Sequence, residues 1–303
     1  MLDLVIIGGS AAGVPASIYA ARRGLNFKLL TKDFNGELAT SGEIGNWPGI
    51  PKTDGLELMD NFRKHLEFLK VPTEEGVEVS KIEKRGEIFE INGGAYQAKS
   101  VILASGAHPR LLGIPGEAEF RNKGVSYCTT CDGPIFSGRT VATIGGGNSA
   151  LESGLMLADI CEKVYVINKN DKFKGDQVLI DNLSARKNVE ILYSVRTKEI
   201  IGKEFVESLR YSDAAGHTLH DLRVDGIFVH IGMIANSAML SSDVQKNLAG
   251  EVIVNRKGET SVPGLFAAGD VTDLPFKQNP IAAGMGVTAL LSAVSYLNRM
   301  TND

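Results

Sequence analysis

The chain contains the same short pattern twice, and this repeat constrains its fold more than any other feature. Each copy is an apolar strand-like run, a glycine-rich turn and a helical stretch; the first spans residues 4–23 and the second residues 141–158. In such a turn one glycine permits a sharp bend, another lets the backbone approach a pyrophosphate, and the last lets the helix pack on the strand. The helix N-terminus then presents free N–H groups to the phosphates. One copy alone is weak evidence, but two copies predict two dinucleotide-binding βαβ units.

The two glycine turns are not identical. The second satisfies the pattern G-x-G-x-x-A, whereas the first has Ser10 where the middle glycine is usual. The Ser10 side chain is either tolerated there or hydrogen-bonds a phosphate, and the sequence leaves both open. The residues expected to hold the nucleotide phosphates are Gly8, Ser10, Ala11, Ala12 and Gly13 in the first turn, and Gly145, Gly147, Asn148, Ser149 and Ala150 in the second.

Three further strand-like runs end in small residues, as parallel strands of an α/β sheet do. They span residues 101–106, 226–232 and 262–270. Breaker residues at 107–116 and 232–236 mark both ends of the second unit. We therefore predict an α/β fold of two Rossmann-like, three-layer ββα nucleotide-binding domains, one inserted into the other. The outer domain is expected to comprise residues 1–110 and 236–303, and the inserted domain residues 111–235.

Composition and charge narrow the classes of partner. The 32 basic and 36 acidic residues give a formal net charge of −4 without a block of like charge, which argues against a nucleic-acid partner. No apolar run approaches the roughly 20 residues of a membrane span, so no membrane partner is expected. The N-terminus lacks a basic region, and three cysteines are too few for a secreted disulfide framework. We expect a cytoplasmic protein.

The motif Cys128-Thr-Thr-Cys131-Asp132 is the chemical centre of the sequence. Positions i and i+3 share one face of a helical turn, which brings two thiols close enough for a disulfide, and a helix N-terminus lowers the pKa of a thiol. Half of a zinc site is the competing interpretation, but it needs a second pair of ligands, and the remaining Cys161 is alone. We therefore expect no metal. Asp132 is a candidate proton donor and acceptor for thiolate exchange, and Cys161 is expected to be a buried structural thiol.

These residues resemble the low-molecular-weight thioredoxin reductase family, the class II pyridine nucleotide-disulfide oxidoreductases, over the whole chain. The second half is also similar to the flavoprotein subunit of alkyl hydroperoxide reductase, which carries an additional N-terminal thioredoxin-like portion. Because the first glycine turn begins at residue 8, we expect the thioredoxin reductase arrangement. The motifs that carry the resemblance are Cys128–Asp132, Gly36–Leu38, Asn46–Gly49, Gly145–Ser149, Gly175–Gln177, Phe266–Asp270 and Pro275–Gln278.

The resemblance implies an FAD enzyme in which the first glycine turn holds the FAD pyrophosphate. By the family pattern Cys131 is the sulfur next to the flavin, Cys128 attacks a protein disulfide, and Asp132 shuttles the proton. The implied partners are thioredoxin or a thioredoxin- or glutaredoxin-like protein disulfide, and a second copy of the chain in a homodimer. The further FAD contacts that it implies are Thr31, Gly36, Glu37, Leu38, Asn46, Ala104, Gly106, Gly269, Asp270, Lys277, Gln278 and Asn279.

The segment about 20 residues past the second glycine turn is where a dinucleotide site distinguishes its coenzyme. Asn168 stands there in place of an acidic residue that would repel a 2′-phosphate, and Lys169 and Lys174 stand where the family has arginines. NADPH is therefore favoured, with NADH possible, although the two lysines are also consistent with a solvated surface. The alternative function is a nicotinamide-independent flavin disulfide oxidoreductase, either a ferredoxin-linked reductase or a dithiol oxidase.

Overall fold

The computed structural model describes residues 1–34, 36–39, 43–216 and 218–300. The chain divides into two compact units, an outer unit of Met1–His108 with Met233–Asp303 and an inserted unit of Pro109–Gly232. The elements of the outer unit are β1 (Leu2–Ile7), α1 (Gly13–Arg22), β2 (Phe27–Thr31), β3 (Glu43–Ile44), β4 (Thr53–Asp54), α2 (Gly55–Phe68), β5 (Thr73–Glu75), β6 (Ile82–Arg85), β7 (Ile88–Ile91), β8 (Tyr96–Leu103), β19 (Leu265–Ala267) and α6 (Asn279–Met300), and the chain passes to and from the inserted unit through β9 (Ala107–Pro109) and β18 (Met233–Ala235).

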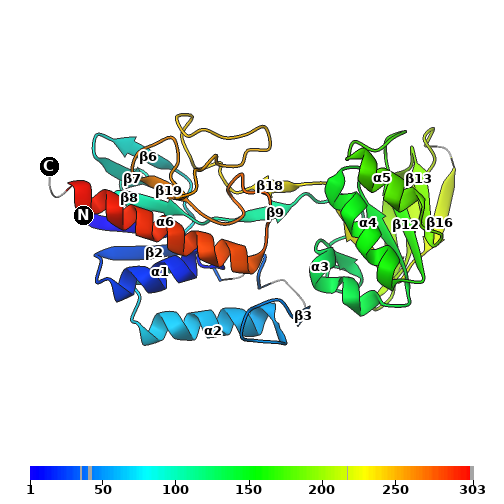
Figure 1. Ribbon diagram of the computed structural model, residues 1–303, viewed down its shortest axis with the longest axis horizontal. Coiled ribbons are helices and arrows are strands. Elements are labelled where there is room, and N and C mark those ends of the chain that lie inside the picture. The colour runs from blue at the N-terminus through cyan, green and yellow to red at the C-terminus, as the bar shows by residue number, and fades with distance from the viewer. Residues whose placement is uncertain (35, 40–42, 217, 301–303) are drawn as a thin grey trace. The chain divides into compact units, whose positions relative to one another are not determined.

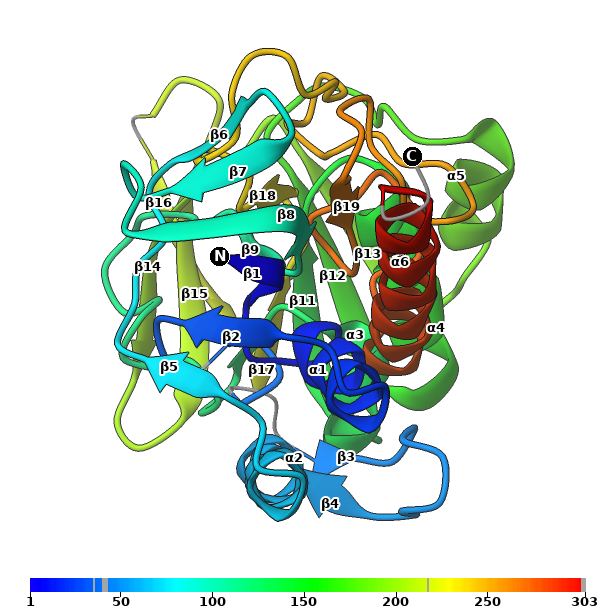
Figure 2. The ribbon, with the colours of Figure 1, turned by 90° about the vertical axis from the view of Figure 1, so that its left-hand side faces the viewer.

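The main sheet of the outer unit has the strand order β5-β2-β1-β8-β7-β6, and β19 also pairs with β8. Strands β5, β2, β1, β8 and β19 are parallel, with Val5 opposite Lys28 and Val101, while β7 and β6 continue the sheet antiparallel. Successive side chains of β1 point to opposite faces. Leu4 and Ile6 pack in a core with α1 and α6, whereas Val5 and Ile7 pack in a second core under the segment that follows residue 239. Helices α1 and α6 thus share one face of the sheet (Figures 1 and 2).

The inserted unit has a five-stranded parallel sheet of order β10-β17-β11-β12-β13 and a three-stranded antiparallel sheet of order β14-β15-β16. Helices α4 and α5 pack against one face of the parallel sheet (Figure 1). Both units therefore have parallel strands joined by helices, as the sequence predicts. The elements of this unit are β10 (Val125–Ser126), α3 (Thr129–Asp132), the 3₁₀ helix η1 (Gly133–Phe136), β11 (Thr140–Ile144), α4 (Asn148–Ile160), β12 (Lys163–Asn168), α5 (Gln177–Ser184), β13 (Val189–Tyr193), β14 (Arg196–Gly202), β15 (Val206–Ser212), β16 (Leu219–Arg223) and β17 (Gly226–Val229).

Helix α6 corrects one expectation from the sequence. By length and composition it is long and apolar enough to cross a membrane, with a mean hydropathy of 1.5 over 18 residues. Gly, Ser and Thr are scattered among the apolar residues of α6, which makes its apolar character easy to overlook in the sequence. The only charged residue of the helix is Arg299. A single such helix is weak evidence for a membrane, since core helices have the same composition. Here α6 buries Ala282, Ala289 and Ala293 in the core, and Gly286 lies where a Cβ would come within 2.0 Å of the Ala12 carbonyl oxygen.

Candidate active site

The first glycine turn connects β1 to α1 and has no room for side chains at two positions. Gly8 has a φ of +110°, and a Cβ there would lie 2.2 Å from the carbonyl oxygen of Ala104. A Cβ on Gly13 would lie 1.8 Å from the carbonyl oxygen of Gly8. The backbone N–H of Gly9 donates to the Thr31 hydroxyl at the end of β2 (3.1 Å). The turn thus lies close to the backbone that follows β8 and is hydrogen-bonded to the end of β2.

A cavity of about 160 Å³ lies in the outer unit beside this turn. Its lining brings together residues from the first turn, from the segment after β2, from the end of β8, from the segment after β19 and from the start of α6. Residues from every one of these segments were expected to contact FAD. Those of the expected residues that line it are Ser10, Ala11, Ala12, Gly36, Glu37, Leu38, Ala104, Gly106, Gly269, Asp270 and Asn279.

Asp270 is the one carboxylate besides Glu37 in the described lining of this cavity. Burial raises the pKa of Asp270, while the Lys277 ammonium opposes that rise. The Asp270 carboxylate makes no hydrogen bond to another residue in the described ranges, so its oxygens are available to hydroxyl donors. A half-buried acceptor beside a glycine cradle and a helix N-terminus fits a flavin dinucleotide with its ribityl hydroxyls and phosphates.

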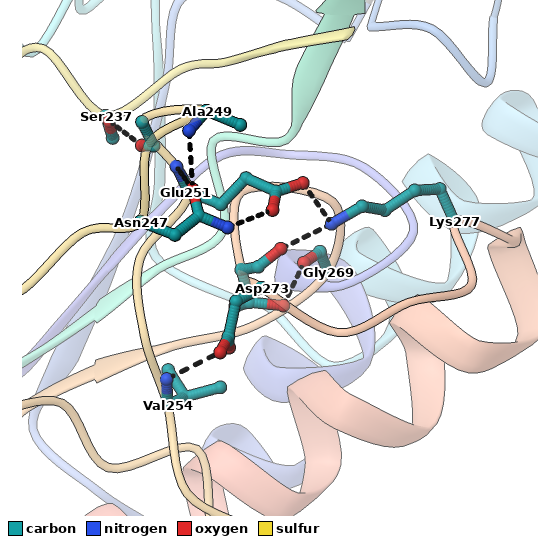
Figure 3. A network of polar contacts seen from close by, with 10 residues as sticks. Ser237, Asn247, Ala249, Glu251, Val254, Gly269, Asp273 and Lys277 are labelled. Carbon is teal, nitrogen blue, oxygen red and sulfur yellow. Dashed lines mark hydrogen bonds and ion pairs between the residues drawn. The ribbon is translucent and has the colours of Figure 1, made fainter. Parts of the chain in front are cut away.

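The other residues expected around the flavin lie outside the cavity lining. Lys277 directs its ammonium to Glu251 Oε1 (3.0 Å) and to the Thr272 carbonyl, within the polar network shown in Figure 3. The structure therefore places its charged end on the neighbouring loop. The Asn46 amide donates to Gln278 Oε1 (3.1 Å), which links the segment after β3 to the residue before α6.

The Ser10 hydroxyl, which stands where a glycine is usual, points toward Met59 Sδ of α2 (3.9 Å). It also lies in contact distance of Gly36, where a Cβ would be 3.5 Å from Ser10 Oγ. The serine is thus accommodated between α2 and the segment after β2. Of the two possibilities left open by the sequence, the structure shows room for the side chain.

A larger cavity, of about 710 Å³, lies in the inserted unit at the carboxyl ends of β11, β12 and β17. The second glycine turn forms one wall. Gly145 has a φ of +156°, and a Cβ there would lie 2.3 Å from the His230 carbonyl oxygen, whereas a Cβ on Gly147 would meet nothing within 4 Å. Helix α4 begins at Asn148, directly after the turn, so its N–H groups face a ligand held there.

Five basic side chains line this cavity, and all five are exposed. Two were expected from the sequence, and three were not. No carboxylate belongs to the described lining, and none of the five forms an ion pair with another described residue. Such a lining favours a ligand with several phosphates. The five are Lys169, Lys174, Arg110, Arg196 and Lys198.

Asn168 has a structural part in this wall. Its buried amide donates to the Lys172 carbonyl (3.0 Å) and accepts from the Asn170 N–H (3.0 Å). The Lys174 N–H in turn donates to the Gly146 carbonyl (2.7 Å). The loop after β12 is thereby folded against the glycine turn, and this brings Lys169 and Lys174 to the cavity. Both atoms of the Asn168 amide group are engaged inside the loop.

The two cysteines of the Cys-Thr-Thr-Cys motif form a disulfide. Cys128 is the N-cap of the short helix α3, and its Sγ accepts from the Cys131 N–H (3.3 Å). The same backbone donor would stabilise a thiolate on Cys128. The third cysteine, Cys161, is buried, and its burial raises the pKa of the thiol to about 11.

Asp132 directly follows the second cysteine and is half-buried. Its Oδ2 accepts from the Ser126 hydroxyl (2.6 Å), while its buried Oδ1 has no hydrogen-bond partner among the described residues. Burial raises the pKa of Asp132, and the Ser126 hydrogen bond partly opposes this rise. A carboxyl group with a raised pKa and an oxygen without a hydrogen-bond partner among the described residues, one position after the dithiol, is suited to take up and return a proton.

Sequence reasoning missed three basic residues and one histidine of the larger cavity. Arg196 and Lys198 lie at the start of β14, far along the chain from the glycine turn. Only the tertiary fold brings them to the cavity. Arg110 and His230 lie at the two ends of the inserted unit. A basic residue next to a strand end was the only available signal, and it is too common to be specific.

Comparisons with known proteins identify the family. The model of the family described as pyridine nucleotide-disulphide oxidoreductase matches residues 2–286. The F subunit of alkyl hydroperoxide reductase from Escherichia coli is 40% identical over 304 residues, covering 98% of this chain and 58% of that protein. A protein of Ferdinandcohnia aciditolerans named NADH dehydrogenase is 38% identical over 302 residues, covering 99% of this chain and 58% of the relative. The chain thus spans somewhat more than half the length of these curated relatives.

Among solved structures, thioredoxin reductase from Streptococcus pyogenes is 32% identical, and the match covers 99% of both chains with a TM-score of 0.91. This likeness confirms the predicted fold and the resemblance to low-molecular-weight thioredoxin reductases. Family membership implies a flavin and a nicotinamide cofactor, for which the two cavities supply fitting residues. The chain belongs to the pyridine nucleotide-disulphide oxidoreductase family.

Proposed function

We propose that this protein passes electrons from NADPH, through FAD, to the Cys128–Cys131 pair and on to a protein disulfide such as that of thioredoxin. The observation that carries the proposal is that one folded unit holds both a redox-active dithiol motif and a large cavity suited to phosphates. The family supplies the coarse chemistry, a flavin between a nicotinamide and a disulfide. The identity of the coenzyme and of the acceptor is our proposal.

NADPH is the favoured donor because of the charge that lines the larger cavity. A dinucleotide with a 2′-phosphate carries more negative charge than one without it, and five cations with no described carboxylate favour the more charged ligand. Lysine provides a point charge without the two-pronged geometry of arginine, so discrimination through Lys169 and Lys174 is expected to be moderate. The same lining weighs against the nicotinamide-independent alternative, which has no use for it.

FAD is assigned to the smaller cavity and its glycine turn. A flavin bound there supplies the two-electron chemistry that connects a nicotinamide to a disulfide. The protein contributes the phosphate cradle at the start of α1, the carboxylate of Asp270 toward hydroxyl groups, and the N-terminus of α6, whose partial positive charge favours an anionic flavin.

The dithiol step uses three residues in the roles that the family resemblance implies. When the pair is reduced, the Cys128 thiolate attacks one sulfur of the substrate disulfide, and the other substrate sulfur leaves as a thiolate. Cys131 then attacks Cys128 in the mixed disulfide, which re-forms the Cys128–Cys131 bond and releases the second substrate thiol. The two electrons of the dithiol have then moved to the substrate. Asp132, with its raised pKa, holds and returns the proton that these thiols exchange.

An anaerobic titration tests the proposal. The purified protein should bind about one FAD per chain, and NADPH should bleach the flavin absorbance at lower concentration than NADH. Thioredoxin disulfide should then be reduced by wild type and by Cys161→Ser, but not by Cys128→Ser, which should retain its FAD. A colourless protein that FAD cannot reconstitute contradicts the flavin assignment. If dithionite bleaches the flavin and neither nucleotide does, the nicotinamide-independent alternative is correct.

A further inference from the structure

A line of hydrogen-bonded side chains connects the larger cavity to the dithiol turn inside the inserted unit. The Thr143 hydroxyl of β11 donates to Ser153 of α4 (3.1 Å), and Ser153 Oγ lies 2.6 Å from Thr129 Oγ1 of α3. Thr129 Oγ1 lies 2.7 Å from Nε2 of His230, which lines the cavity. The three hydroxyl-bearing residues are buried. Thr129 immediately follows Cys128, so the line ends at the disulfide.

The hydrogens along this line can all point in one direction. Thr143 directs its hydrogen to Ser153, which leaves the Ser153 hydrogen for Thr129 and the Thr129 hydrogen for His230 Nε2. This direction requires an unprotonated Nε2. Burial lowers the pKa of His230 to about 4, so the ring is neutral near pH 7, and in the tautomer that carries its hydrogen on Nδ1 the Nε2 atom accepts. The line is then satisfied at every step between β11 and the imidazole.

We infer that His230 is a positioning residue that couples a ligand in the larger cavity to the reactivity of Cys128. The inference rests on the proposed function, because it takes that ligand to be a nicotinamide nucleotide. The ligand meets His230, His230 holds Thr129, and Thr129 fixes the turn in which the Cys131 N–H donates to Cys128 Sγ. If the ligand also shifts the redox equilibrium of the pair, the redox state of the pair changes the affinity for the nucleotide by the same factor, because the coupling of two equilibria is reciprocal.

The dithiol half of the inference is tested without turnover. The full-length holoenzyme is reduced, the reductant is removed, and alkylation of Cys128 by iodoacetamide is followed by peptide mass between pH 5 and pH 9. Thr129→Val removes the hydroxyl and keeps the side-chain shape, whereas Thr130→Val makes the same change at the next, exposed position. We expect Thr129→Val to slow alkylation near pH 7 roughly fivefold and to move the pH midpoint upward, as the loss of one hydrogen bond does. Equal rates in the two variants overturn the inference.

The nucleotide half uses 2′-phospho-ADP-ribose as the probe, because it carries the phosphates of the coenzyme but cannot accept a hydride. We expect this probe to change the Cys128 alkylation rate at least twofold in wild type and in His230→Gln, whose amide oxygen can accept from Thr129. The change should be absent in His230→Leu and in Thr129→Val. An unchanged rate in wild type, or an undiminished response in both disruptive variants, overturns the inference.

Calorimetry with the same probe separates this inference from the proposed function. If the probe binds and the alkylation rate does not respond, the coupling through His230 is wrong while the coenzyme assignment stands. If the probe does not bind at all, the coenzyme assignment and the coupling are both wrong. Failure of the flavin titration with a normal alkylation response would instead contradict the proposed electron path alone.

Discussion

Replacing Lys169 and Lys174 together with alanine should reduce the preference for NADPH over NADH. Both side chains are exposed, line the larger cavity and are brought to it by the loop that Asn168 folds. A charge-assisted contact contributes roughly 1–1.5 kcal/mol, or about tenfold in affinity, so two contacts amount to roughly a hundredfold. Because exposed charges are screened by solvent, we expect a decrease of about thirtyfold in the ratio of kcat/KM values.

The assay measures flavin reduction and steady-state turnover with each coenzyme. Lys187→Ala with Lys203→Ala is the matched control, since these two exposed lysines belong to the same unit but lie outside the cavity lining. In wild type the preference should weaken as salt is added, and in the cavity variant it should change little. An equal loss in the control variant, or a wild type that prefers NADH, refutes the reasoning.

Three further outcomes follow from single positions. Burial raises the pKa of Asp132, so its negative charge destabilises the folded protein at any pH above that raised pKa, and this effect disappears below the pKa of an ordinary aspartate. Asp132→Asn should therefore raise the thermal midpoint at pH 8 and raise it less near pH 4. The same variant should slow disulfide reduction. Gly145→Ala should lower the thermal midpoint, whereas Gly147→Ala, with open space for its Cβ, should keep the fold and mainly weaken nucleotide binding in calorimetry. Cys161, with a pKa of about 11, should resist iodoacetamide at pH 8 until the protein is unfolded in urea.

Local patterns in the sequence predicted the parts of the site that depend on neighbouring residues. The glycine turns follow from steric demands within a few residues, as the short Cβ distances at Gly8 and Gly145 show. The dithiol motif is likewise local, because Cys128 and Cys131 lie on one helical turn. Each of these features depends on residues that are close together in the sequence, so the sequence alone was sufficient to find them.

Features that depend on contacts between residues far apart in the sequence were not predictable in the same way. Lys198 is a common exposed residue in the sequence and becomes a cavity residue only because β14 starts beside the loop after β12. His230 has no motif, and its contact with Thr129 depends on how α3 packs near the end of β17. Lys277 fits the family motif, but its ammonium is drawn to Glu251 by an ion pair that no local pattern encodes.

The insertion of one unit into the other also sets the order in which the chain can fold during synthesis. The inserted unit is one continuous stretch, Pro109–Gly232, so it can complete its core as soon as that stretch has left the ribosome. The outer unit must wait, because β19 and α6 are made after the inserted unit. Until then the face of β1 and α1 that α6 covers remains open to water and to chaperones. The contact between α1 and α6 closes a loop that contains the whole inserted unit, and closing so long a loop slows folding. The apolar face of a newly made outer unit is therefore covered only when α6 packs on it.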